Sequence, residues 1–169
     1  MTTYRIIEGK SHMVVRARSS IHDSETVWKK VTGTVHADSA NLAQSGATAS
    51  FTVDMRDFDA GDWLKNRKLK KDLDADSHPH ATFELTGLEE VQQASDGSFE
   101  ARALGTLSWR GRSVDVVAKG TGTLDDSHVE VKATFELDVT KLGVKPPRVL
   151  MFKVEDVVEV TVTLHGIVS

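Results

Sequence analysis

The stretch VEVKATFELDV, residues 129–139, decides the fold class, because its apolar and polar residues alternate without a break. Successive side chains of a β-strand point to opposite faces, so a period of two predicts one buried face and one solvated face. The apolar members are Val129, Val131, Ala133, Phe135, Leu137 and Val139. We therefore predict a strand whose inner face packs against an apolar interior.

The same period recurs along the chain and predicts further strands. Residues 49–55 and 158–164 alternate as strictly as the first stretch. Shorter runs bring the count to about eight strands, joined by turn-like segments. These runs are Met13–Ser19, Val31–Ala37, Ala81–Leu88, Phe99–Trp109 and Val114–Lys119. An open antiparallel sheet of this size would leave long unpaired edges, so we expect an all-β, eight-stranded antiparallel barrel. Nothing resembles a linker or a repeat, which predicts a single domain over residues 1–169.

One segment departs from the period of two and predicts a short helix. Residues 62–76, DWLKNRKLKKDLDAD, contain no β-branched residue and begin with Asp62, a suitable N-cap. At the helical period, Trp63, Leu69 and Leu73 share one sector with Asn66. We expect this helix, between the third and fourth predicted strands, to lay its apolar side over the barrel as a lid. Its basic residues are either a solvated face or a cationic rim that contacts an anionic head group or membrane surface.

Composition and motifs exclude several classes of function. The formal net charge of −4 gives no global basic field, so we expect no nucleic-acid partner. The absence of cysteine excludes disulfides, thiolate metal sites and thiol catalysis. No catalytic signature is recognisable, and the sequence is interpreted as that of a non-enzyme without a cofactor. The N-terminal residues lack the apolar core of a signal peptide, which predicts a cytoplasmic protein, or a periplasmic one if the chain is a processed form.

Four short segments contain residues of the types found in catalytic, metal or ligand sites. In SHPHATFEL, residues 77–85, His78 and His80 point to the same side of an extended chain, which allows two metal ligands. A third ligand would have to come from a histidine or carboxylate elsewhere in the chain, so we expect a hinge between helix and strand rather than a metal site. The consecutive residues 22–24, HDS, cannot form a catalytic triad. Residues 54–62 lack the spacing of a calcium loop. Pro146-Pro147 predicts a turn, and the apolar residues 150–152 either pack in the core or line a barrel mouth.

The predicted inner faces mix large side chains with unusually small ones. The small residues are Ala17, Gly33, Ala49, Ala101, Ala103, Gly105, Ala118 and Ala133. Because protein interiors tolerate few voids, these residues indicate either a ligand cavity or the close approach of neighbouring backbones in a filled barrel. The pattern alone leaves both alternatives open.

Several ordered segments together resemble the bacterial YceI-like family of lipocalin-like barrels associated with polyisoprenoid binding. The similarity runs from about Tyr4 to the C-terminus. It rests on Ser11, Met13 and Val15, on residues 19–22 (SSIH), 31–35 (VTGTV), 78–83 (HPHATF), 105–111 (GTLSWRG) and 143–147 (GVKPP), and on the strand at residues 157–164. The resemblance implies a lipocalin-like barrel whose pore holds a prenyl or other lipid-like tail, without catalytic residues and often as a homodimer. The chain lacks the Arg-Asp-x-His-Leu segment of many members, and has Asn66-Arg67-Lys68-Leu69 in that region.

We therefore expect a protein that binds, carries or sequesters an amphiphilic isoprenoid or other lipid-like small molecule, with peripheral membrane contact. The alternatives are a ligand-free structural or stress-response interaction module with a filled barrel, and an enzyme that acts on a hydrophobic substrate. The predicted ligand contacts are Met13, Val15, Phe51, Val53, Met55, Trp63, Leu69, Leu73, Phe83, Leu85, Leu107, Trp109, Phe135 and Val160.

Overall fold

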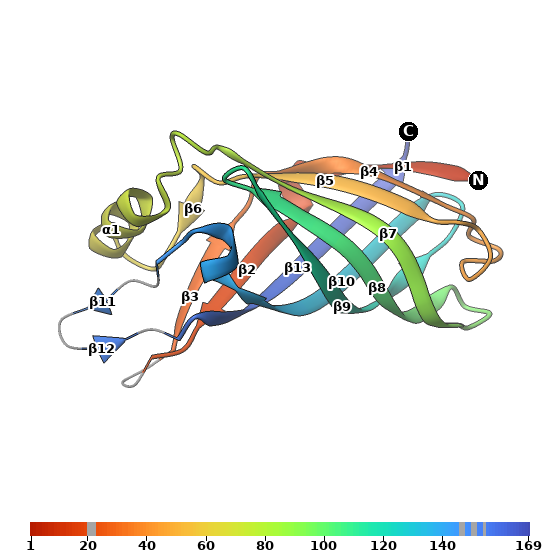
Figure 1. Ribbon diagram of the computed structural model, residues 1–169. Coiled ribbons are helices and arrows are strands. Elements are labelled where there is room, and N and C mark those ends of the chain that lie inside the picture. Colours follow the sequence, from red (N-terminus) through yellow and green to blue (C-terminus); the bar gives the residue numbers. More distant parts are fainter. Residues whose placement is uncertain (20–22, 146–147, 150–151, 154) are drawn as a thin grey trace.

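The computed structural model describes residues 1–19, 23–145, 148–149, 152–153 and 155–169, and within them an antiparallel sheet curls into a barrel (Figure 1). Its strands are β1 Thr2–Ile6, β2 His12–Ala17, β3 Ser24–Trp28, β4 Val31–Ala37, β5 Thr48–Asp54, β6 Phe58–Asp59, β7 His80–Gln93, β8 Ser98–Trp109, β9 Arg112–Leu124, β10 His128–Asp138 and β13 Val157–Val168. The short pair β11 Arg148–Val149 and β12 Phe152–Lys153 forms a separate sheet. The helices are α1 Trp63–Leu73 and the 3-10 helices η1 Glu8–Lys10 and η2 Val139–Leu142.

Strand β13 closes the barrel because it is long enough to pair with three other strands. It pairs with β10 along one edge, and on the other edge with β1 at one end and β2 at the opposite end. Among the described residues, eight strands complete the ring in the order β1-β4-β5-β7-β8-β9-β10-β13, and β2, β3 and β6 extend it. The predicted closed, eight-stranded antiparallel barrel is therefore confirmed.

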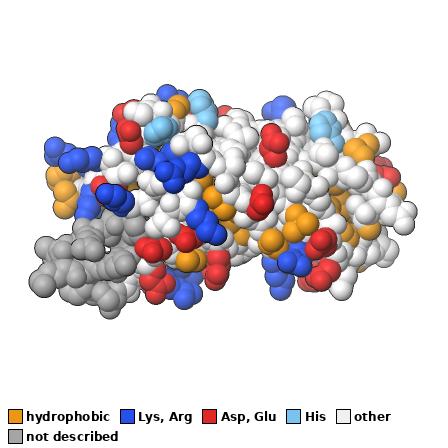
Figure 2. Space-filling view, in the orientation of Figure 1, with side chains coloured by type: hydrophobic (Ala, Val, Ile, Leu, Met, Phe, Trp, Pro, Cys, Tyr) orange, Lys and Arg blue, Asp and Glu red, His pale blue; other side chains and the backbone are white. Residues whose placement is uncertain are grey.

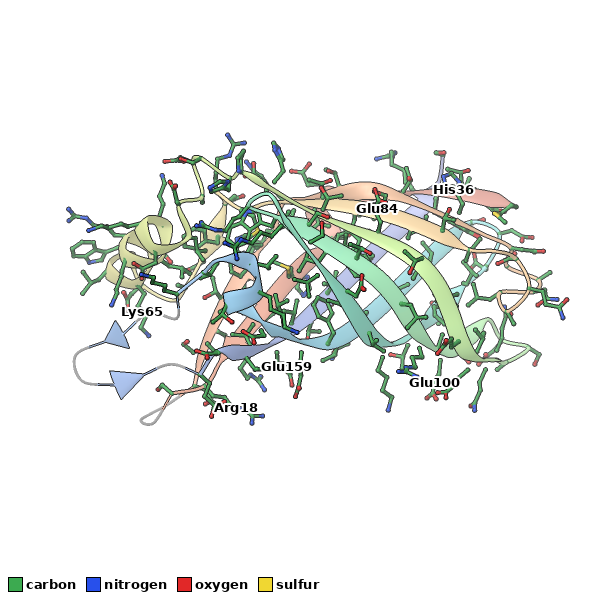
Figure 3. All side chains as sticks on the ribbon, in the orientation of Figure 1. Arg18, His36, Lys65, Glu84, Glu100 and Glu159 are labelled. Atoms are coloured by element: carbon green, nitrogen blue, oxygen red, sulfur yellow. The ribbon has the colours of Figure 1, made fainter. Side chains whose placement is uncertain are left out.

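The alternation read from the sequence corresponds to inner and outer faces. On β7, Phe83 is 8% exposed and packs in the core, whereas Glu84 is exposed. Figure 3 shows Glu84 and Glu100 pointing away from the barrel. The same period holds on β13, where Val158, Val160, Val162 and Leu164 are all buried. The inner face of the sheet is therefore apolar, and its buried residues form two clusters.

Helix α1 begins directly after Asp62, as predicted, and ends at Leu73, three residues before the end of the predicted segment. The side chain of Asp62 accepts a hydrogen bond from Lys65 N at 2.8 Å, which satisfies one of the free N–H groups of the first turn. Asp74 adopts the left-handed conformation with φ 49° and ends the helix. Arg110, in the turn between β8 and β9, donates from Nη1 to Leu73 O at 2.6 Å. The C-terminal end of the predicted lid is thus fastened to the barrel wall.

Strand boundaries show what the pattern missed. Strands β1, β3 and β6 were not predicted, because each is too short to show a clear alternation of apolar and polar residues. Strand β9 continues to Leu124, through Gly120 and Gly122, although glycine is disfavoured in strands. A side chain at Gly122 would collide with Glu130 O on β10, so close backbone approach requires glycine there. Residues 20–22 and the predicted turn at Pro146-Pro147 lie outside the described residues, as do the side chains of residues 150–152.

Candidate ligand-binding cavities

An apolar cavity of about 170 Å³ lies inside the barrel at the end that carries α1. Strands β2 and β3, the end of β5, helix α1 and the segment after β10 contribute to its lining. Twelve of the fourteen predicted ligand contacts line it. They are Met13, Val15, Phe51, Val53, Met55, Leu69, Leu73, Phe83, Leu107, Trp109, Phe135 and Val160.

Trp63 and Leu85 are placed elsewhere. Leu85 lines a second cavity, described below. Trp63 lines neither cavity and is 72% exposed, so the structure does not bring it together with the other predicted contacts. As the first residue of α1, directly after the N-cap Asp62, Trp63 has no preceding helical turn to pack on, and helical side chains lean toward the N-terminus. Its side chain is consequently exposed to solvent.

Three lining residues on β3 were missed by sequence reasoning. Ser24, Thr26 and Trp28 face the first cavity, and Thr26 is 9% exposed. The signal was present, because they alternate with Glu25 and Val27, but the run is only five residues long. Ser24, Thr26 and Glu155 are the polar residues among the described lining of this cavity. They can accept or donate hydrogen bonds to a polar head group.

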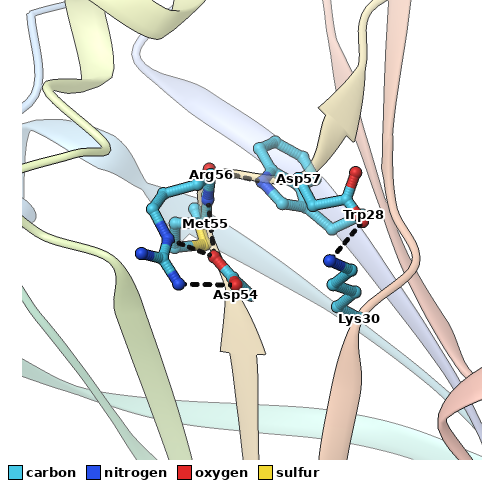
Figure 4. A network of polar contacts seen from close by, with 6 residues as sticks. All are labelled: Trp28, Lys30, Asp54, Met55, Arg56 and Asp57. Carbon is cyan, nitrogen blue, oxygen red and sulfur yellow. Dashed lines mark hydrogen bonds and ion pairs between the residues drawn. The ribbon is translucent and has the colours of Figure 1, made fainter.

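A polar network fixes the turn after β5 at the edge of the first cavity (Figure 4). Trp28 Nε1 donates to Met55 O at 3.4 Å, and both side chains line the cavity. Arg56 donates from Nε and Nη2 to the two carboxylate oxygens of Asp54, at 3.0 and 2.9 Å. These hydrogen bonds lower the pKa of Asp54 to about 2. The turn is thereby held in one arrangement beside the lining residue Met55.

The segment SHPHATFEL joins the end of α1 to the barrel wall. His78 O accepts a hydrogen bond from Trp109 Nε1 at 2.8 Å, and β7 begins at His80. The guanidinium carbon of Arg110 lies 5.5 Å from the centre of the Trp109 ring. Within the part of the chain that the structure describes, no cluster of His, Asp and Glu has the arrangement of a metal site. The two histidines lie in the connection between helix α1 and strand β7, which the hydrogen bond from Trp109 holds against the barrel wall.

A second apolar cavity, of about 110 Å³, occupies the opposite end of the barrel. Its described lining is entirely apolar and includes seven alanines. Five of the small residues noted in the sequence are among them, and Ala17 lines the first cavity. The five are Ala49, Ala101, Ala103, Ala118 and Ala133. These alanines therefore leave space, in agreement with the cavity interpretation.

The two glycines follow the other interpretation. A Cβ atom on Gly105 would lie 2.7 Å from Glu84 O and 3.0 Å from Phe83 Cε1. A Cβ atom on Gly33 would lie 2.6 Å from Phe51 Cα. Both glycines are needed because a neighbouring strand comes too close for any side chain. The small residues thus have two roles. Some leave space for a cavity and others allow strands to pack closely, and the sequence pattern does not distinguish the two.

The exposed surface of α1 combines basic and apolar side chains. Lys and Arg side chains are visible around this end of the molecule (Figure 2). Those on the helix are Lys65, Arg67, Lys68, Lys70 and Lys71, all exposed. Beside them Trp63 is 72% and Leu64 62% exposed. Among the described residues, no helix has the length and apolar character needed to cross a membrane.

A closed antiparallel barrel with apolar internal cavities and a helix over one end defines the class of lipocalin-like barrels. Within that class, the chain belongs to the family of proteins with a YceI-like domain, whose model matches residues 4–165. No curated protein matches the sequence.

Solved structures with the same fold span nearly the whole chain. BcnA of Burkholderia cenocepacia is 23% identical, with a TM-score of 0.74, 97% of this chain covered and 99% of that chain. A polyisoprenoid binding domain from Saccharophagus degradans, implicated in plant cell wall breakdown, is 12% identical, with a TM-score of 0.76 and full coverage of both chains. The YceI protein of Campylobacter jejuni is 14% identical, with a TM-score of 0.63, 85% of this chain covered and 84% of that chain. At these identities the likeness establishes the fold.

Proposed function

We propose that this protein binds an amphiphilic isoprenoid or other lipid-like molecule without chemical change, with the tail inside the barrel. The observation that carries the proposal is the first cavity, which is apolar except for a few polar groups and is large enough for a benzene-sized group. Removal of apolar tail surface from water would supply the binding free energy, at about 25 cal/mol per Å². The polyisoprenoid-binding neighbour of the same fold supports this choice of ligand class.

The polar residues of the first cavity give the ligand an orientation. Ser24 and Thr26 would hydrogen-bond a hydroxyl or phosphate head group, and the tail would extend toward the apolar centre of the barrel. The alternative of a ligand-free interaction module requires a filled barrel. The two cavities make it the less favoured alternative, because well-packed cores contain few such voids.

Purification from the native host, followed by native mass spectrometry and lipid extraction, tests the proposal. We expect a bound amphiphile of defined mass in the wild type. Ala17→Phe fills part of the first cavity and should lower the bound fraction at least tenfold. Ala94→Phe adds the same ring at an exposed position outside both cavities and should leave the bound fraction unaltered. A wild type that is always empty, and that takes up no prenyl alcohol, would exclude the proposed function.

The surface of α1 supports a contact with anionic membranes during loading. Each Lys or Arg near such a surface contributes about 1 kcal/mol of attraction, and interfacial indoles sit at the head-group level. The double variant Trp63→Ser, Leu64→Ser should reduce sedimentation with phosphatidylglycerol vesicles about tenfold. The variant Val117→Ser, at an apolar residue 48% exposed on the barrel wall, is the matched control. Equal sedimentation of all forms would contradict the membrane contact.

A further inference from the structure

Three phenylalanine rings separate the two cavities. Phe51 on β5 and Phe83 on β7 are stacked, with ring centroids 5.0 Å apart. Phe135 comes from β10, which β8 and β9 separate from β7, and its centroid is 6.3 Å from that of Phe83. All three residues belong to the lining of both cavities. The rings therefore form a partition across the interior.

A glycine on a neighbouring strand accommodates one of these rings, and a second glycine lies against the backbone of another. Gly105 pairs with Leu85, and the Phe83 ring occupies the space that a side chain at Gly105 would need. Gly33 pairs directly with Phe51 and could not carry a side chain either. The position of the Phe83 ring is thus part of the packing of the barrel wall.

The two sides of the partition differ in polarity. Ser24, Thr26 and Glu155 line the first cavity, whereas the described residues around the second cavity are all apolar. A polar group buried without a hydrogen-bond partner costs free energy, so the head group of an amphiphile is stable only on the first side. The tail must then approach the partition from that side.

The first cavity is short for a long tail. A cavity of about 150 Å³ accommodates one benzene molecule, and the first cavity has about 170 Å³. We infer that Phe51, Phe83 and Phe135 select ligands by tail length. A short tail ends against the rings, and a longer tail must separate them to enter the second cavity. The inference rests on the proposed function and adds the residues that determine its specificity.

Displacement of the fluorescent probe N-phenyl-1-naphthylamine by geraniol and by the twice longer geranylgeraniol measures this selection. The quantity to compare is the ratio of the two dissociation constants, which removes any effect common to both ligands. Phe135→Ala opens the partition and should shift the ratio about tenfold toward geranylgeraniol. Phe58→Ala removes an equal ring outside both cavities, beside Trp28, and should leave the ratio within about threefold of wild type.

Two further variants test the length selection even if Phe135→Ala does not fold. Phe135→Leu, a smaller deletion, should shift the ratio about threefold in the same direction, even if the alanine variant does not fold. Addition of Ala103→Leu, which fills the second cavity, should return the ratio of the Phe135 variant to that of wild type. The length selection is refuted if both alcohols bind and neither Phe135 variant shifts the ratio, or if Phe58→Ala shifts it equally. If neither alcohol displaces the probe from any form, the proposed function itself fails, and the selection with it.

Discussion

Replacing Gly105 with alanine perturbs the contact of β8 with two residues of β7, Phe83 and Glu84. The added Cβ atom would lie 2.7 Å from Glu84 O and 3.0 Å from Phe83 Cε1, and closer still to Phe83 Cζ. Cβ atoms essentially never make contacts shorter than 3.0 Å, so the Glu84 carbonyl or the Phe83 ring must shift, or Gly105 itself. Overpacking of a core by one methyl group typically costs about 1–3 kcal/mol. We expect the free energy of unfolding to fall by that amount, and the melting temperature by roughly 2–4 °C for each kcal/mol.

Gly87 provides the matched control on the paired strand. A Cβ atom there meets nothing within 4 Å, and its φ is not positive. Gly87→Ala should be neutral or stabilising by up to about 1 kcal/mol, because it reduces the entropy of the unfolded chain. Urea unfolding followed by tryptophan fluorescence measures both variants. If Gly105→Ala is within about 0.5 kcal/mol of Gly87→Ala, the claim that Gly105 makes room for the Phe83 ring is refuted.

Two further predictions concern the ends of the first cavity. Arg110→Ala removes the hydrogen bond to Leu73 O and should cost about 1 kcal/mol, with faster amide hydrogen exchange in α1, whereas Arg102→Ala on the outer wall should not change that exchange. Arg56→Ala removes the hydrogen bonds that lower the pKa of Asp54 to about 2. A lowered folded-state pKa stabilises the protein above the unfolded value and loses its effect as pH falls through the folded value. The variant should therefore be less stable than wild type above about pH 4, and the difference should vanish below about pH 2 in urea titrations; a pH-independent difference would contradict it.

Most of the barrel wall could be predicted because strand faces are a local property. The pattern at residues 129–139 corresponds to β10, and that at 158–164 to the centre of β13. Strand β7 runs on to Gln93, beyond the predicted Leu88, through register shifts near Gly87 and Gln92 that break the period of two. Strand β1 was missed because its five residues gain their stability from β4 and β13, at distant places in the sequence.

Some of the cavity residues could be predicted from the sequence and others could not. Inward-facing positions such as Val15 and Val160 follow from alternation, and both line the first cavity. The exposure of Trp63 did not follow from helical periodicity, which gives the side of the helix on which a residue lies but not whether the first turn contacts the barrel. Thr26 and Trp28 lie on a strand too short to be recognised without its partner β2.

Sequence alone determined which side chains face inward, since alternation along a strand fixes the face of each residue whatever its partner. Tertiary structure decided what the inner face encloses. Ala103 and Ala133 leave a cavity, whereas Gly105 is filled by a ring from the next strand, and no local pattern distinguishes them. The partition depends likewise on Phe83 and Phe135 meeting across the barrel. Space inside a closed sheet is a property of facing residues, and only the closure of the barrel establishes which residues face each other.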